Sequence, residues 1–290
     1  MRGFKKRLDS GSYSLVGKTV AISGATGGLG RQLCMRCCEL GASLILLDRN
    51  KSKSEGLIDE LKHDFPCLVA EHITLDLEDF EQVKSVSDRL CSRELDYLVL
   101  NAGAYSIPRH KCSTGFDNVF QINFLSPYYM ARRLLPVLKV RGGRVVAVSS
   151  IAHNYSKINE KDVDFSSVRA ASKVYGNAKR FLTYSFFELD GYGKNAAVTH
   201  PGITVTNITA HYPPFVYALI KYPMRVIFMS AKKASLSILC GMFEDCAPSE
   251  WIGPAIFNVW GNPRISTLNT ADEYERRKIK EIVELIQGKL

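Results

Sequence analysis

The sequence lacks a long uninterrupted apolar run. Residues 1–16 contain neither a continuous apolar core nor a small-residue cleavage site, so they do not have the features of a secretory leader. The most apolar and aromatic stretch, residues 212–230, is interrupted by Lys221, Pro223 and Arg225, which argues against a membrane-spanning helix. We therefore expect a protein of the reducing cytoplasm, with peripheral contact at a membrane surface left open.

The sequence also lacks the residue spacing of a metal site. Cys34 and Cys37 form a C-x-x-C pair next to Cys38, but neither a second pair nor a set of histidines completes a zinc site. The six histidines are scattered along the chain. We expect no metal, and we expect the three neighbouring cysteines to pack in the core from a helix.

Internal repeats and low-complexity linkers are absent as well. With 290 residues, of which 46% are hydrophobic and 23% charged, the chain has the composition of one large globular domain. The formal net charge of +9 favours anionic partners, such as nucleic acid, an acidic membrane surface or a phosphorylated cofactor. The positive clusters at residues 2–7 and 276–280 are interpreted as solvated faces, so we expect no nucleic-acid partner.

The sequence does contain a glycine-rich turn between a short strand and a helix. A strand is expected at residues 19–22 and a helix at residues 31–40, with Ser-Gly-Ala-Thr-Gly-Gly-Leu-Gly between them. Glycines let the backbone approach a pyrophosphate, and a helix N-terminus stabilises its charge. The predicted dinucleotide contacts in this turn are Gly24, Thr26, Gly28, Leu29 and Gly30.

An acidic residue ends the second expected strand, at residues 43–47. Asp48 follows Gly30 at roughly the spacing of 20 residues at which an acidic side chain binds the ribose hydroxyls of an adenosine. Such a carboxylate would repel a 2′-phosphate, which favours NAD. The neighbouring Arg49 could embrace that phosphate instead, so both residues are predicted cofactor contacts and NADP stays open.

Strands and helices alternate along the first half of the chain. The strands do not alternate in polarity, which indicates a parallel sheet covered by helices on both faces. We predict an α/β fold with a Rossmann-type doubly wound parallel sheet, in a single domain of residues 17–290 after a basic, irregular lead-in at residues 1–16. Helices are expected at 51–64, 78–90 and 116–140, and strands end at 75–77 and at 100. Because ligands bind at the carboxyl ends of such strands, further predicted cofactor contacts are Asp76, Leu77, Asn101, Ala102 and Gly103.

A tyrosine and a lysine lie four residues apart in the second half of the chain. On a helix, Tyr175 and Lys179 would share one face, where the ammonium could lower the pKa of the phenol. Ser150 follows a strand at residues 144–149 and could hydrogen-bond a substrate oxygen beside that phenol. By itself such a pair is weak evidence, since a packed tyrosine beneath a surface lysine has the same spacing.

Beyond a strand at residues 196–199, the chain opens into the loop 200–206. The apolar segment at about 207–232 is predicted to be a lid over a hydrophobic substrate, with shallow membrane contact and a packed helix pair as alternatives. The last helix is amphipathic and is expected to dock on the domain, because apolar residues recur at Ile279, Ile282, Val283 and Ile286.

Together these motifs resemble the short-chain dehydrogenase/reductase family over about residues 18–206. The long loop between serine and tyrosine and the Tyr-Gly-Asn-Ala-Lys box are similar to the retinol dehydrogenase branch. The resemblance implies a catalytic tetrad. Tyr175 would be the acid/base, Ser150 would bond the reacting oxygen, Lys179 would lower the pKa of Tyr175 and hold the nicotinamide ribose, and Asn123 would anchor a water chain.

The resemblance further implies direct hydride transfer between a nicotinamide and an apolar alcohol or carbonyl substrate. Pro201 and Gly202 would flank the nicotinamide, and Thr204 or Thr206 would bond its amide. Three residues depart from the common pattern of the family. Ser23 replaces a threonine that is common in the family, and Leu100 replaces a common asparagine. Asp48 replaces the small residue that precedes arginine in many NADP-using members. The last departure favours NAD and alcohol oxidation.

Two other functions fit parts of the pattern. The glycine spacing also matches sugar-nucleotide epimerases and dehydratases, but the Asn-Ala-Gly box at 101–103 and the short remainder after Gly202 favour a dehydrogenase. A non-catalytic dinucleotide sensor on the same fold would not need both Tyr175 and Lys179. A homo-oligomer is compatible with the sequence, as is a monomer.

Overall fold

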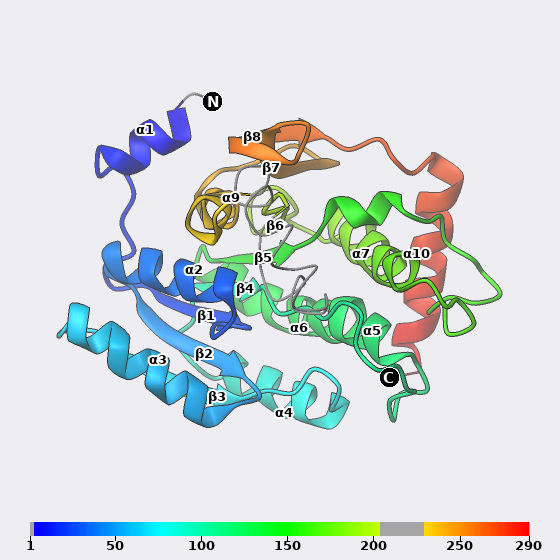
Figure 1. Ribbon diagram of the computed structural model, residues 1–290, viewed down its shortest axis with the longest axis horizontal. Helices are drawn as coiled ribbons and strands as arrows, with labels where there is room; N and C mark the ends of the chain where they lie inside the picture. The colour runs from blue at the N-terminus through cyan, green and yellow to red at the C-terminus, as the bar shows by residue number, and fades with distance from the viewer. Residues whose placement is uncertain (1–2, 204–228, 290) are drawn as a thin grey trace, which may run out of the picture.

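An eight-stranded sheet forms the centre of the molecule (Figure 1). The computed structural model describes residues 3–203 and 229–289. The strand order is β3-β2-β1-β4-β5-β6-β7-β8, and all neighbouring strands run parallel except β7 and β8. The predicted doubly wound parallel sheet is confirmed, with one antiparallel strand at its edge. The strands are β1 (Thr19–Ser23), β2 (Ser43–Asp48), β3 (Ala70–Thr74), β4 (Tyr97–Leu100), β5 (Arg144–Val148), β6 (Ala196–Thr199), β7 (Glu250–Ile256) and β8 (Trp260–Thr267).

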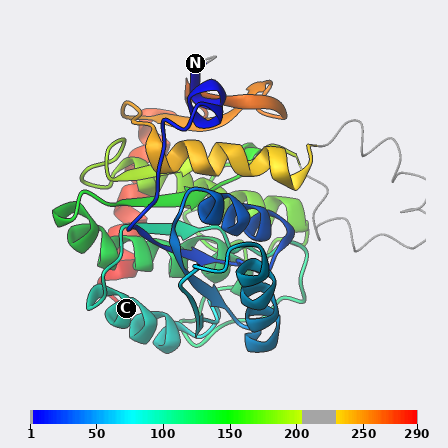
Figure 2. The same ribbon diagram turned by 90° about the vertical axis from the view of Figure 1, so that its left-hand side faces the viewer.

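Helices cover both faces of this sheet. They are α1 (Gly3–Asp9), α2 (Gly28–Glu39), α3 (Lys51–Asp64), α4 (Phe80–Cys91), α5 (Asn118–Phe120), α6 (Ser126–Val140), α7 (Ala171–Phe187), α9 (Ala231–Phe243) and α10 (Glu273–Gln287). Val20 and Ile22 pack beneath α2, α3 and α9, whereas Ala21 between them packs beneath α4, α6 and α7. Figure 2 shows α2 and α9 side by side on the first of these faces. Burial on both faces explains why the strands are uniformly apolar.

The predicted packing role of the clustered cysteines agrees with the structure. Cys34, Cys37 and Cys38 are buried on α2 in the core between this helix and the sheet. Burial raises the pKa of the Cys37 thiol well above its ordinary value, so the thiol is neutral at physiological pH and these residues act as small apolar side chains.

The helix expected at residues 116–140 is interrupted. α5 leads directly into a π-helical turn, η1 (Gln121–Leu125), and α6 follows without a break. A π-turn takes in an extra residue and is frequent at functional sites. Asn123 lies at its centre and is fully buried; its Nδ2 donates to the carbonyl oxygens of Ala104 and Val119, both at 2.8 Å. The turn thus supplies partners for a polar side chain in an otherwise apolar face.

The two ends of the chain compare differently with the sequence prediction. The lead-in predicted to be irregular contains α1, which is anchored by buried Phe4 and by an ion pair of 2.6 Å between Arg7 and Glu244. A helix of about two turns is too short for apolar periodicity to reveal. The amphipathic C-terminal helix is confirmed as α10, which packs on α7 and buries Ile279, Val283 and Ile286.

Three further elements, β7, β8 and α9, were not predicted from the sequence. Gly253 and Pro254 in β7 and Pro263 in β8 resemble breakers in the sequence. Proline is tolerated at the edge of a sheet, where one side of the strand needs no ladder hydrogen bond. In addition, β3 ends at Thr74 rather than at residues 75–77, and α4 begins at Phe80 after Asp79, whose side chain accepts from the N–H of Gln82.

Most of the predicted lid at 207–232, together with Thr204 and Thr206, lies outside the described residues. Its described end leads into α9 through Ser230, whose side chain accepts from the N–H of Lys233. Among the helices of the described ranges, none combines the length and the apolar character that crossing a bilayer requires.

Candidate active site

The glycine turn joins β1 to α2 and leaves a helix N-terminus facing the site. Gly24 has φ +66°, and a Cβ there would lie 2.9 Å from the Cα of Ala102. A Cβ on Gly30 would collide with the carbonyl oxygen of Gly24, so the helix can approach the turn only with glycine at this position. The N-cap residue of α2 is Gly27, which has no side chain with which to cap the first turn. Its N–H groups therefore suit the diphosphate of a dinucleotide.

Asp48 ends the neighbouring strand, β2, and lines the same cleft. Its carboxylate accepts hydrogen bonds from Thr26 Oγ1 at 3.1 Å and from Ser54 Oγ at 3.3 Å. It is 6% exposed, and burial raises its pKa above the usual range for aspartate. Arg49 turns away from it, with its guanidinium 3.9 Å from Asp76 and 3.8 Å from Glu78. The Asp48 carboxylate and the Arg49 guanidinium are therefore not paired with each other, and each is a separate potential contact for a ligand in the cleft.

The end of β4 holds the glycine turn in place. Ser23 Oγ accepts the backbone N–H groups of Asn101 and Ala102, each at 3.0 Å. The side chain of Asn101 donates to the carbonyl oxygens of Ser23 and Gly24 at 3.0 and 3.1 Å. Ser23 thus makes two backbone hydrogen bonds at the position where the family often has threonine, and Asn101 supports the glycine turn.

The four predicted catalytic residues come from three elements at one end of the cleft. Ser150 follows β5 and caps a short 3₁₀-helix, η2 (Ile151–Asn154); Tyr175 and Lys179 lie one turn apart on α7. The Ser150 side chain lies near enough to Tyr175 to lower the pKa of its phenol. Lys179 Nζ donates to the carbonyl oxygen of Val148 at 2.8 Å and lies 5.6 Å from the centroid of the Tyr175 ring. Asn123 is behind them, and a Cβ on Gly103 would be 2.8 Å from its Oδ1 and 3.6 Å from Lys179 Nζ.

The pKa of Tyr175 shifts in the direction opposite to the sequence expectation. Burial raises it to about 12, against an opposing hydrogen bond with Ser150. Burial also lowers the pKa of Lys179 to about 7, so the ammonium is only partly populated at neutral pH. Both groups favour their neutral forms because desolvation penalises charge.

The glycine turn, Asp48, Ser150, Tyr175 and Lys179 line one cleft of about 1090 Å³. All predicted cofactor contacts lie along it except Thr204, which is outside the described residues. Beyond Tyr175, its walls include Tyr105, Ile151, Tyr155 and Ile203, which the sequence analysis did not single out. Tyr105 packs edge-on against Tyr175, with ring centroids 5.4 Å apart. Tyr105, Ile151 and Ile203 lie in loops that follow the carboxyl ends of β4, β5 and β6, and this position was the signal that could have identified them.

A family model described as short chain dehydrogenase matches residues 18–214. The chain belongs to the short-chain dehydrogenase family. It is 29% identical over 245 residues to Retinol dehydrogenase 12 of Mus musculus, covering 82% of this chain and 77% of the relative. It is 29% identical over 308 residues to Retinol dehydrogenase 14 of Homo sapiens, covering 94% and 87%. A crystal structure of an uncharacterized protein from Mycobacterium Paratuberculosis shares the fold over 95% of both chains, with a TM-score of 0.75 at 24% identity.

These relatives confirm the resemblance to the retinol dehydrogenase branch. As a member of the short-chain dehydrogenase family, the protein is an oxidoreductase. The match favours this function over the sugar-nucleotide epimerase and the non-catalytic sensor.

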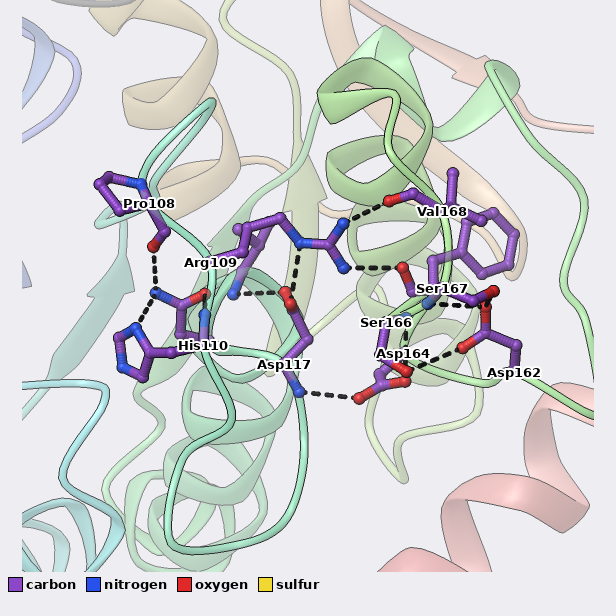
Figure 3. A network of polar contacts seen from close by, with 12 residues as sticks. Pro108, Arg109, His110, Asp117, Asp162, Asp164, Ser166, Ser167 and Val168 are labelled. Carbon is purple, nitrogen blue, oxygen red and sulfur yellow. Dashed lines mark hydrogen bonds and ion pairs between the residues drawn. The ribbon is translucent and has the colours of Figure 1, made fainter.

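In this dehydrogenase, an arginine connects the loop after β4 to the long loop between Ser150 and Tyr175 (Figure 3). Arg109 donates to Asp117 Oδ2 at 2.8 Å, to the carbonyl oxygen of Phe165 at 2.7 Å, and to that of Val168. Phe165 has φ +55° and packs in a small core against which Tyr175 also packs. Arg109 thus secures the loop whose small core packs against Tyr175.

The structure also forms a polar cluster that the scattered histidines did not predict. Potential ligand atoms of Glu78, His110 and Cys112 lie within 4.8 Å of one another. Asn118 Nδ2 donates to the carbonyl oxygen of Pro108 at 3.1 Å and lies 3.2 Å from His110 Nδ1, which must therefore be the acceptor. The ring proton is then on Nε2, 2.9 Å from Glu78. Nε2 thus donates to Glu78, and we interpret this cluster as a hydrogen-bonded support of the loop.

We expect the free energy of unfolding of wild type, relative to Lys179→Met, to rise as the pH increases from 7 to 8.5. In this range the unfolded chain binds a proton at Lys179, whose ordinary pKa is 10.5, and the folded chain increasingly does not. The slope should approach about 1.4 kcal/mol per pH unit. Urea denaturation at several pH values measures it. A difference that stays constant with pH would contradict the lowered pKa.

We expect Arg109→Met to loosen the loop at residues 156–170. The variant leaves two backbone carbonyls and the Asp117 carboxylate without their donor, which costs about 1–3 kcal/mol per unsatisfied group. Thermolysin should then cleave this loop faster than in wild type. Arg169→Met, an exposed change in the same loop, is the control and should leave the cleavage rate unchanged. Equal rates for both variants would show that Arg109 does not hold the loop.

Proposed function

We propose that this chain is an NAD-dependent alcohol dehydrogenase that interconverts a small apolar alcohol and its carbonyl compound. The observation that carries the proposal is the geometry of the cleft. One end of the cleft contains Asp48 and the N-terminus of α2, whose N-cap residue is Gly27. The other end brings together Ser150, Tyr175 and Lys179. A bound nicotinamide would supply the hydride chemistry. The protein supplies orientation and proton transfer.

Tyr175 is the acid/base at the substrate oxygen, and Ser150 bonds that same oxygen, as the position of both side chains in the lining of the cleft supports. With its pKa raised to about 12, Tyr175 is a phenol at neutral pH, the form that donates a proton to a carbonyl oxygen. Alcohol oxidation requires the phenolate, which a nearby positive charge stabilises. The Lys179 ammonium lies within reach of the ring and supplies part of that charge. Asn123, held in the π-turn, anchors the proton path on the far side of Lys179.

The preference for NAD rests on the different environments of Asp48 and Arg49. Thr26 and Ser54 orient the Asp48 carboxylate, which is the acceptor for the ribose hydroxyls. Arg49 is 67% exposed and lies near two carboxylates, so binding a 2′-phosphate would require it to leave them. NADP therefore remains the second choice.

The substrate class follows from the wall beyond Tyr175. Tyr105, Ile151, Tyr155 and Ile203 make this part of the cleft largely apolar. Two relatives named retinol dehydrogenase support an apolar alcohol or aldehyde. The cytoplasmic location, peripheral membrane contact and homo-oligomer remain predictions from the sequence.

We expect the protein to bind NADH more tightly than NADPH, and Asp48→Ala to remove this preference. The variant loses the acceptor for the ribose hydroxyls and the repulsion of a 2′-phosphate. Titrations that follow nicotinamide fluorescence measure both dissociation constants. Asp59→Ala, an exposed change on α3, is the control. Tighter binding of NADPH by wild type would assign Arg49 the dominant contact, and binding of neither dinucleotide would overturn the proposed function.

We expect Tyr175→Phe to lower kcat for apolar alcohols and aldehydes by about 10²–10⁴-fold, the usual contribution of general acid/base catalysis. The dissociation constant for NADH should change much less, because the phenol acts on the substrate oxygen. Steady-state kinetics with a panel of linear and isoprenoid substrates measures kcat. Tyr274→Phe, on the exposed side of α10, should be active. Unchanged turnover in Tyr175→Phe would exclude Tyr175 as the acid/base.

A further inference from the structure

His153 is a fully buried histidine close to the candidate catalytic serine. It is the third residue of η2, which begins directly after Ser150. Its Nδ1 lies 2.7 Å from the carbonyl oxygen of Ser150, and its backbone N–H donates to the same oxygen at 3.1 Å. Because a carbonyl oxygen only accepts, Nδ1 carries the ring proton. One residue therefore holds the Ser150 carbonyl with two donors.

The other ring nitrogen of His153 contacts the C-terminal arm, defined as residues 268–275, which leads from β8 into α10 (Figure 1). Its Nε2 lies 3.0 Å from Thr270 Oγ1 and accepts the hydroxyl proton, since Nδ1 is the protonated nitrogen. Thr270 Oγ1 in turn accepts from the Tyr184 hydroxyl at 2.6 Å. The Thr270 N–H donates to that hydroxyl oxygen at 3.1 Å. In this series of hydrogen bonds each group donates to the next, from Tyr184 to Thr270, from Thr270 to His153, and from His153 to the Ser150 carbonyl.

A buried ion pair fixes the arm against α7. Arg180 follows Lys179 in the sequence and donates to Glu275 at 2.7 and 2.5 Å. The same guanidinium donates to the carbonyl oxygens of His153 at 2.9 Å and of Thr270 at 2.7 Å. Arg180 and Glu275 are 2% and 5% exposed, so breaking this pair would leave an uncompensated buried charge. The arm therefore has one position relative to η2.

We propose that His153 is a positioning residue for Ser150, oriented by Thr270 of the C-terminal arm. This inference rests on the proposed function, in which Ser150 Oγ bonds the reacting oxygen. The ring of His153 is wedged edge-on against Trp251, with centroids 5.1 Å apart and planes at 81°, which limits its rotation. The Ser150 carbonyl fixes the tautomer, and Thr270 holds the unprotonated Nε2 and with it the orientation of the ring. The ring in turn holds the carbonyl, and the carbonyl sets the direction of the Ser150 side chain toward Tyr175.

Thr270→Val tests the proposal, because it removes the hydroxyl and keeps the shape of the side chain. We expect kcat to fall about tenfold, since displacing a catalytic group by a fraction of an ångström has effects of this order. The dissociation constant for NADH should not change, because Ser150 acts on the substrate. Thr270→Ser, which restores the hydroxyl, should return kcat to within about twofold of wild type. Thr267→Val, an exposed change at the end of β8, is the matched control.

A pair of histidine variants tests the direct contact. Asparagine reproduces the position of Nδ1 and can donate to the Ser150 carbonyl, whereas glutamine reproduces the position of Nε2. We expect His153→Asn to retain more of the wild-type kcat than His153→Gln. Imidazole ¹⁵N shifts provide a readout that needs no activity, and wild type should show a protonated Nδ1 and an unprotonated, hydrogen-bonded Nε2. In Thr270→Val the Nε2 signal should move to the position of an unprotonated nitrogen that lacks this hydrogen bond.

The outcomes separate this proposal from the proposed function. Wild-type kcat in Thr270→Val, a wild-type ring protonated on Nε2, or an equal loss of NADH affinity and kcat would each overturn the role of His153 while leaving the dehydrogenase activity. A wild-type protein that binds neither dinucleotide and oxidises no alcohol would overturn the proposed function and the positioning role with it.

Discussion

The buried hydrogen bond between Lys179 and the end of β5 is the contact on which the candidate active site depends. Lys179 is 3% exposed, and its Nζ donates to the carbonyl oxygen of Val148 at 2.8 Å. This bond draws α7 against the strand from which Ser150 emerges two residues later. One turn earlier on the same helix face, Tyr175 is brought to Ser150. A single backbone carbonyl thus determines that the serine and the tyrosine meet. Because burial of an ammonium is costly, the pKa of Lys179 falls to about 7, and the contact persists in either protonation state as an N–H to carbonyl bond.

Two glycines allow the surrounding elements to come this close. A Cβ on Gly176 would collide with the carbonyl oxygen of Ala152, so η2 can pack on α7 only where the helix has no side chain. Gly103 has the same role on the other side, between Asn123 and Lys179. Local packing therefore explains the glycine in the Tyr-Gly-Asn-Ala-Lys box without a demand on backbone φ. The close packing also leaves little water around Tyr175 and Lys179, which is the reason that their pKa values shift.

The sequence predicted the part of the site that is built from local pattern. Gly24, Asp48 and Asn101 each follow an apolar strand, and the parallel topology alone brings strand ends to one edge of the sheet. Residues whose partners are distant in sequence were not predictable in this way. His153 contacts Thr270, and Arg109 contacts Phe165 and Val168, across loops whose course no periodicity reveals. The strand β8 was missed because its proline is acceptable only at an edge, and edge position is a property of the finished sheet.

The charge state of the free cleft indicates how proton transfer and ligand binding are connected. Burial raises the pKa of Tyr175 and lowers that of Lys179, so the neutral pair is the more stable state when no further charge is near. Any positive charge that enters this end of the cleft favours the phenolate and disfavours the ammonium. The raised pKa of Tyr175 favours keeping its proton, whereas the lowered pKa of Lys179 favours losing one. Tyr175 loses its proton most readily while Lys179 is still protonated. Burial therefore keeps the Tyr175 phenol protonated until a positively charged ligand enters the cleft. The low dielectric that suppresses ionisation in the free protein then strengthens the attraction that permits it.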